Sequence, residues 1–377
     1  MSRAPRPTAA GTPTDPGSGP PGGGAGPLNL LEFEALAVPR LDPGVAAYYG
    51  GAAADELTLA DNLAAFRRWR LLPRMGVEIE GRDPSVEVLG RRWPAPVMVA
   101  PLALVRMADP DGEVAVARAC AARGLTMSLS TVGSATIEEV AAAGAPTWFQ
   151  LYVLRDPGRS RDLLDRAAAA GCEAIILTLD APILGRRERD LRTGFALPPG
   201  VHYANIRRAG TRRVDTYGGD DIKPSNTWAD LSWTVANTRL PVIAKGILHP
   251  DDARRALDEG AAAIGVSNHG GRQLDLTIAA LDALPGIGDA VAGRAPLLFD
   301  SGIRRGTDIL VALALGARAV MVGRPLLWAL AWGGEAGVGL AFDLLLAELD
   351  QALALAGVPR ATDVSRELLV RAASSPS

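Results

Sequence analysis

One short segment of the chain concentrates side chains that could move a proton beside an anion. Residues 267–275 read Ser-Asn-His-Gly-Gly-Arg-Gln-Leu-Asp and directly follow the apolar run AIGV. A neutral imidazole accepts a proton at physiological pH, and a guanidinium can hold a carboxylate through two parallel hydrogen bonds. His269 and Arg272 therefore indicate a base beside a carboxylate-binding cation, although a histidine at the end of a strand can also be purely structural.

Eight apolar runs of strand length recur along the chain, each followed by a turn and an Ala- and Leu-rich stretch with helical periodicity. Continuous apolar runs are typical of buried parallel strands. Eight βα units predict an α/β fold, a closed (β/α)8 TIM barrel. A doubly wound open sheet is the alternative, but no glycine-rich dinucleotide motif follows the first run. The runs begin near Val97, Thr126, Thr147, Ala174, Val242, Ala263, Leu297 and Val320.

The remaining segments suggest one domain with additions. Residues 1–27 are rich in Pro and Gly and are predicted to be a disordered tail, and residues 28–377 form the barrel domain. Two helices, near 29–37 and 59–69, should form an N-terminal cap joined through Tyr48-Tyr49-Gly50-Gly51. The polar segment from about 191 to 226 follows the fourth strand and is predicted to be a lid.

The composition of the chain argues against nucleic-acid and membrane binding. A net charge of -3 provides no basic field for nucleic acid or anionic membranes, which favours a small-molecule substrate. Cys120 and Cys172 lack metal-ligand spacing and are expected to be buried thiols in a reducing compartment. The chain shows neither a secretory signal nor an apolar run long enough to span a bilayer, so we expect a cytoplasmic protein with no metal and no membrane partner.

The active site of a (β/α)8 barrel lies where its strands end, so the residues that end the apolar runs are the candidates. Several cations should meet there, which favours a base over a structural role for His269. The loops after strands seven and eight are expected to bind phosphate, although Gly-Arg-Pro at 323–325 could be simple turn chemistry. The candidates are Ala100, Pro101, Leu102, Ala103, Ser130, Gln150, Tyr152, Thr178, Asp180, Lys245, Ser267, His269, Arg272, Asp300, Gly302, Arg304, Gly323 and Arg324.

Three of these motifs together carry a family resemblance. The 267–275 segment, with Lys-Gly-Ile at 245–247 and Asp-Ser-Gly-Ile-Arg-Arg-Gly-Thr-Asp at 300–308, resembles the FMN-dependent 2-hydroxy-acid oxidases and dehydrogenases. That family includes glycolate oxidase, lactate oxidase, hydroxymandelate oxidase and mandelate dehydrogenase. The resemblance extends from about residue 28 to the C-terminal region, and it implies FMN as cofactor, oxidation of an (S)-2-hydroxy acid to the 2-oxo acid, and a homotetramer.

The resemblance also implies roles for the substrate-binding residues. His269 would be the base, Asp180 would stabilise its protonated form, and Tyr152 would bond the substrate hydroxyl. Arg272 and Arg187 would hold the substrate carboxylate with the help of the Tyr48 hydroxyl. On sequence alone, Arg187 could equally be a solvated charge within Gly-Arg-Arg-Glu-Arg at 185–189.

The cofactor-binding residues follow from the same resemblance. Lys245 would lie by the flavin N1 and O2 atoms, where a positive charge stabilises the reduced ring. The backbone of residues 100–103 would line one face of the ring, with Ser130, Gln150 and Thr178 bonding its edge. Ser267 completes this group, and the phosphate would lie near Asp300, Gly302, Arg304, Gly323 and Arg324.

Departures from the family pattern bear on specificity. Ser301 stands where relatives commonly have glycine, and Leu102 where many have threonine. Val132 replaces an aromatic residue of the glycolate- and lactate-type enzymes, which implies a larger pocket and a bulky or aryl substrate. Ala103 matches the oxidases and favours oxygen as electron acceptor. A dehydrogenase with another acceptor, a different FMN-dependent activity such as isomerisation, and a noncatalytic flavin-binding barrel are the alternatives.

Overall fold

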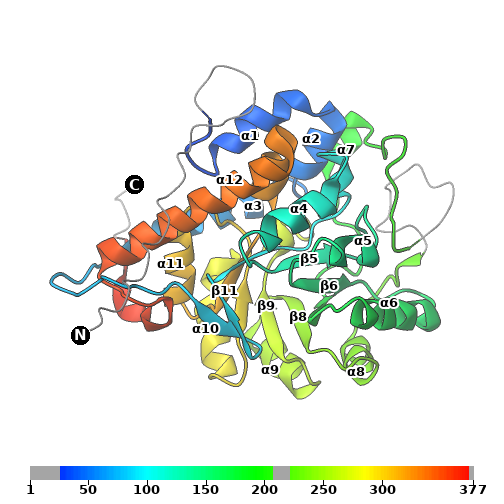
Figure 1. Ribbon diagram of the computed structural model, residues 1–377. Helices are drawn as coiled ribbons and strands as arrows, with labels where there is room; N and C mark the ends of the chain where they lie inside the picture. Colours follow the sequence, from blue (N-terminus) through cyan, green and yellow to red (C-terminus); the bar gives the residue numbers. More distant parts are fainter. Residues whose placement is uncertain (1–25, 207–220, 373–377) are drawn as a thin grey trace, which may run out of the picture.

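Eight parallel strands form the centre of the molecule (Figure 1). The computed structural model describes residues 26–206 and 221–372. The strand order is β4-β11-β10-β9-β8-β7-β6-β5, and a bridge between Met98 and Thr126 joins the two end strands, so the barrel is closed. The strands are β4 (Val97–Val99), β5 (Met127–Ser130), β6 (Thr147–Leu151), β7 (Ala174–Thr178), β8 (Val242–Ile247), β9 (Ala263–Val266), β10 (Leu297–Phe299) and β11 (Ala319–Val322). The barrel prediction is confirmed.

Helices follow the strands and cover the outside of the barrel (Figure 1). Glycines with positive φ, among them Gly124 at 64° and Gly316 at 110°, end several of these helices shortly before the next strand. The helices are α4 (Gly112–Ala121), α5 (Ile137–Ala141), α6 (Pro157–Ala169), α8 (Trp228–Ala236), α9 (Pro250–Asp258), α10 (Ala280–Val291), α11 (Gly306–Ala314) and α12 (Arg324–Ala356). Within the described ranges, no helix is both long and apolar enough to cross a membrane.

The N-terminal cap contains one helix more than expected. Its helices are α1 (Glu32–Ala37), α2 (Pro43–Gly50) and α3 (Leu57–Ala64). The prediction of a simple joint at Tyr48-Tyr49-Gly50-Gly51 was therefore wrong, because the first three of these residues end α2. Asp42 accepts a hydrogen bond from Gly44 N at 2.8 Å and Pro43 opens the helix, which is a recognisable start signal.

Two small antiparallel pairs complete the fold. Strand β1 (Trp69–Leu71) pairs with β12 (Leu369–Arg371), and β2 (Val86–Val88) pairs with β3 (Arg91–Trp93). None of these strands was predicted from the sequence, in which only helices were expected before the barrel. Both cysteines are buried thiols as expected, and burial raises the pKa of each to about 12.

The segment after β7 lies against the loops that follow β5 and β6. It begins with α7 (Glu188–Thr193), a helix that packs beside α2 (Figure 1). Farther on, Ala204 N donates to Gly133 O at 2.9 Å, and Ile222 forms a bridge with Leu154. Residues 207–220 of the predicted lid, and residues 1–25 of the predicted tail, lie outside the described residues.

Candidate active site

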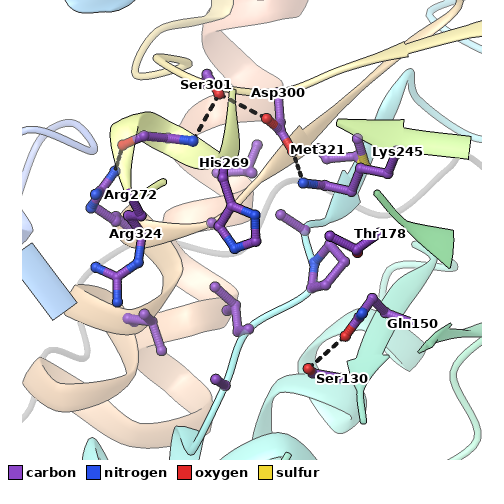
Figure 2. A pocket seen from close by; sticks show the side chains of 18 of the residues that line it. Ser130, Gln150, Thr178, Lys245, His269, Arg272, Asp300, Ser301, Met321 and Arg324 are labelled. Atoms are coloured by element: carbon purple, nitrogen blue, oxygen red, sulfur yellow. Dashed lines mark hydrogen bonds and ion pairs between the residues drawn. The ribbon is translucent and has the colours of Figure 1, made fainter. Parts of the chain in front are cut away.

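A cavity opens at the carboxyl ends of the barrel strands. Most of the candidates selected from the sequence line it, and Figure 2 shows several of them around the His269 ring. Segments from every strand end and from the cap therefore meet in one place. The predicted residues in the lining are Tyr48, Ala100, Pro101, Leu102, Ala103, Ser130, Val132, Gln150, Tyr152, Thr178, Lys245, His269, Arg272, Asp300, Gly302, Arg304, Gly323 and Arg324.

The candidate base is paired with a carboxylate. His269 Nδ1 lies 2.9 Å from Asp180 Oδ1. Burial lowers the pKa of His269, with Lys245 and Arg187 adding to the effect, and Asp180 opposes this shift without reversing it. Burial alone would raise the pKa of Asp180, but His269 and Lys245 outweigh it and the pKa is lowered. At neutral pH the pair is therefore a neutral imidazole beside an ionised carboxylate.

A glycine makes room for Asp180. Gly246 at the end of β8 has φ 98°, and a Cβ there would lie 2.6 Å from the Cβ of Asp180. Only glycine permits both this backbone conformation and this close approach. The Lys-Gly-Ile motif at 245–247 thus positions Asp180 as well as Lys245.

Lys245 is held inside the barrel by two partners. Its Nζ atom lies 3.1 Å from Asp300 Oδ2 and donates to Ser267 Oγ at 2.9 Å. Ser267 Oγ also accepts from His269 N at 3.0 Å. Ser267 does not line the cavity; it connects the buried ammonium group to the backbone of the candidate base.

Tyr48 and two arginines form a second cluster on the cap side. The guanidinium groups of Arg272 and Arg187 lie over the Tyr48 ring, at 5.0 and 5.8 Å from its centroid. Arg272 Nη1 donates to Tyr48 O and Gly51 O, both at 2.7 Å, which fixes the end of α2. Arg187 is buried, with 3% of its surface exposed, so it is not the solvated charge that the sequence allowed.

Three polar side chains lie at the carboxyl ends of β5, β6 and β7. Ser130 Oγ donates to Gln150 Oε1 at 2.7 Å (Figure 2), and Thr178 is buried beside them at the end of β7. The Gln150 Nε2 group is buried and has no hydrogen-bond partner among the described residues. A buried amide without a partner is costly, so this group suits a ligand that offers an acceptor.

Positive charge accumulates on the opposite side of the cavity. Arg304 and Arg324 both line it, and burial lowers the pKa of each. For Arg324 the neighbouring Arg272, Arg304 and Arg187 lower the pKa further. The Arg324 guanidinium donates to the carbonyl oxygens of Tyr49, Gly51 and Gly270 at 2.9–3.0 Å. A bound anion would offset this concentration of cations.

Some residues of the site were missed from the sequence. Asp190 of α7 is partly buried, and desolvation raises the pKa of its carboxyl against the opposing effect of Arg272 and Arg187. Gln273 Nε2 donates to the carbonyl oxygens of Asp180 and Ile183. No local pattern marked Asp190, whereas Gln273 stands within the 267–275 motif, where no role was assigned to it. The other lining residues that were not selected are Tyr49, Gly270, Ser301, Ile303, Met321, Val322 and Leu327.

The comparisons with known proteins agree with this arrangement. A family model described as FMN-dependent dehydrogenase matches residues 37–371. The chain belongs to this family. This enzyme is 47% identical over 357 residues to an L-lactate oxidase of Nostoc sp., with 91% of this chain and 98% of the relative covered. It is 44% identical over 338 residues to a 4-hydroxymandelate oxidase of Amycolatopsis orientalis, with coverage of 88% and 94%.

A solved structure extends the likeness to three dimensions. The crystal structure of a mandelate oxidase has a TM-score of 0.87 and 42% sequence identity, and the match covers 92% of this chain and 99% of the other. The enzyme is thus an FMN-dependent enzyme that oxidises 2-hydroxy acids. The residues present fit FMN: Gln150 Nε2 has no hydrogen-bond partner within the described part of the chain, and Arg304 and Arg324 concentrate positive charge.

Proposed function

We propose that the enzyme oxidises an (S)-2-hydroxy acid with a bulky or aryl side chain to the 2-oxo acid, with His269 as the base. The supporting observation is the His269–Asp180 pair, whose Nδ1–Oδ1 distance is 2.9 Å. Because Nδ1 faces Asp180, Nε2 is the atom that takes a proton from the substrate. The imidazolium that results is stabilised by the carboxylate of Asp180. FMN, when bound, accepts the two electrons.

The substrate carboxylate would bind among Arg272, Arg187 and Tyr48. The two guanidinium groups over the Tyr48 ring supply the positive charge, and the tyrosine hydroxyl supplies a further donor. Tyr152 lines the same cavity and would bond the substrate hydroxyl. This arrangement would place the reacting carbon between the carboxylate site and His269.

FMN would occupy the rest of the cavity. Lys245 would lie by the N1 and O2 atoms of the ring, and the backbone of residues 100–103 would line one ring face. Ser130, Gln150 and Thr178 would bond the ring edge, where the Gln150 amide needs an acceptor. The phosphate would bind among Asp300, Gly302, Arg304, Gly323 and Arg324, where cations are in excess.

The apolar wall supports a large substrate side chain. Val132 is buried, with 2% exposure, and lines the cavity together with Leu102 and Ala103. Leu104 N donates to Val132 O at 3.3 Å, so the loop after β4 and the loop after β5 form one wall. Crystal structures of mandelate oxidase have been described with (S)-4-hydroxymandelic acid and with benzoyl-formic acid. A similarly sized ring is the substrate group proposed here.

Oxygen is the proposed electron acceptor. The two electrons and two protons taken from the hydroxy acid would pass to oxygen and yield hydrogen peroxide. The relatives named as oxidases support this choice, as does Ala103 in the lining. A dehydrogenase with another acceptor would consume little oxygen per substrate oxidised.

One experiment tests the substrate preference and the electron acceptor in two separate steps. Purified enzyme is mixed anaerobically with mandelate, lactate or glycolate, and the loss of oxidised-flavin absorbance is recorded. We expect the fastest bleaching with mandelate, and, when air is admitted, the highest kcat/KM for mandelate with one peroxide formed per substrate oxidised. A preference for lactate, the substrate named for the Nostoc relative, would reject the large-substrate proposal while the family stands. Bleaching without reoxidation by air would reject oxygen.

Self-association is also proposed, with a homotetramer as the state that the resemblance implies. Large apolar side chains are exposed on the loops after β7 and β9, including Ile183 at 70%, Leu274 at 73% and Leu276 at 79%. Such clustered exposure is common at protein interfaces. Light scattering at several concentrations would give the mass directly, and a monomer throughout would reject the proposal.

A further inference from the structure

Ser301 adopts a backbone conformation that disfavours its own side chain. It follows β10, is 8% exposed and has φ 82°, a region that favours glycine. A strained residue persists where its surroundings hold it, and such residues gather at functional sites. The side chain of Ser301 must therefore make contacts that offset this cost.

Those contacts connect two parts of the active site. Ser301 Oγ donates to Asp300 Oδ1 at 2.8 Å and accepts from Gly270 N at 3.1 Å (Figure 2). Gly270 is the residue after the candidate base, and Asp300 is the carboxylate that pairs with Lys245. The hydroxyl thus links the backbone beside His269 to the ion pair next to the proposed flavin site.

We propose that Ser301 is a positioning residue that sets the charge beside the flavin. Its hydroxyl donates to Oδ1 of Asp300, and Oδ2 of the same carboxylate lies 3.1 Å from the Lys245 ammonium. A carboxylate that already accepts a hydrogen bond offsets less of its partner's positive charge. More of the Lys245 charge therefore acts on the reduced, anionic flavin ring.

The same hydroxyl helps to hold the shape of the loop after β9. His269 and Gly270 both have positive φ, at 58° and 64°. Ser267 Oγ accepts a hydrogen bond from His269 N, and Ser301 Oγ accepts one from Gly270 N. Two serine hydroxyls, one after β9 and one after β10, thus bind consecutive backbone amides of this turn. The Ser267 hydroxyl also bonds with Lys245, and the Ser301 hydroxyl also bonds with Asp300.

Two substitutions at position 301 distinguish the effect of losing the hydroxyl from the effect of relieving backbone strain. Ser301→Ala removes the hydroxyl and keeps a side chain at positive φ, whereas Ser301→Gly removes the hydroxyl and relieves the backbone. If the hydroxyl sets the charge, both variants should lower the midpoint potential of bound FMN and slow anaerobic flavin reduction by about tenfold, as for a lost hydrogen bond to a charged group. Their thermal stabilities should differ, with the glycine variant the more stable.

This inference rests on the proposed function, because it needs Lys245 to lie beside the flavin. A third variant, Lys245→Met, tests that placement separately. Lys245→Met should lower the potential by more than either Ser301 variant does. If Lys245→Met shifts the potential and neither Ser301 variant does, the role of Ser301 is rejected alone. An unchanged potential in Lys245→Met would instead reject the proposed placement of Lys245, and the inference with it. Should the alanine variant fail to fold, the glycine variant still provides the measurement.

Discussion

His269 Nδ1 and Asp180 Oδ1 lie 2.9 Å apart although the two residues are 89 positions apart in the chain. Burial lowers the pKa of the imidazole, and His269 and Lys245 lower the pKa of the Asp180 carboxyl against the effect of burial. The pair can thus accept a proton at neutral pH and hold the resulting charge, which is the property required of a base in hydroxy-acid oxidation.

Replacement of the base should separate cofactor binding from chemistry. His269→Gln keeps a polar side chain in the cavity, so the variant should still purify with FMN. Flavin reduction by a 2-hydroxy acid should fall by about a hundredfold to ten-thousandfold, the range expected for loss of a general base. Stopped-flow absorbance under anaerobic conditions measures this rate. Reduction close to the wild-type rate would contradict the assignment of His269.

Asp180→Asn should change the pH profile in a defined direction. The Asp180 carboxylate raises the pKa of His269 against the lowering effect of burial, so its removal should lower that pKa further. The acidic limb of the rate profile should therefore move to lower pH, while the plateau rate falls by about ten- to a hundredfold because the imidazolium loses a charged partner. An acidic limb displaced to higher pH would show that Asp180 does not act on His269 in this way.

The same pair predicts an acid-sensitive stability. His269 has a lowered pKa in the folded state, so below its ordinary pKa of about 6.5 the unfolded chain binds the proton first. Asp180 also makes the folded state less stable as the pH falls below its own ordinary pKa, because its pKa in the folded state is lowered as well. The free energy of unfolding should decrease as the pH falls from about 6.5. Denaturant titrations should show a shallower decrease over pH 5–7 in His269→Gln, which cannot take up that proton.

Val132→Trp tests the size of the pocket. A larger residue on the buried wall should exclude an aryl side chain, and kcat/KM for mandelate should fall by about ten- to a hundredfold relative to lactate. Val132→Leu provides a matched control, because it adds much less volume. His269 and the arginine cluster are untouched, so activity on the small acid should survive. Equal losses on both substrates would indicate a disturbed fold instead of a size filter.

Proteolysis tests whether the start of the predicted lid responds to ligand. Phe195 stacks on Tyr48 with centroids 4.6 Å apart, and the nearby Arg192 side chain is 76% exposed. A bound 2-oxo acid that engages Tyr48 should hold this segment and slow tryptic cleavage after Arg192. Mass spectrometry of the fragments gives the rate at this bond. Phe195→Ala should lose the protection, and equal cleavage with and without ligand would reject the coupling.

The sequence by itself determined the barrel and most of its candidate residues. The strand starts were located to within one residue, because a buried strand is a continuous apolar run and a glycine that ends a helix has a fixed local role. The base and the cations were visible because they stand at strand ends, and the barrel topology brings every strand end to one face.

The tertiary structure decided what the local patterns could not. Asp180 was named as the partner of His269 only through the family resemblance. Whether Arg187 is buried, and which groups surround Arg324, depend on contacts between loops that are distant in the chain. Helix α2 was missed because its aromatic and glycine residues are weak helix formers and its end is fixed by Arg272. Ser301 shows the same limit: its sequence position suggested a replaced glycine that either crowds the phosphate region or adds a hydrogen bond there, and its bonds with Gly270 and Asp300 followed only from the fold.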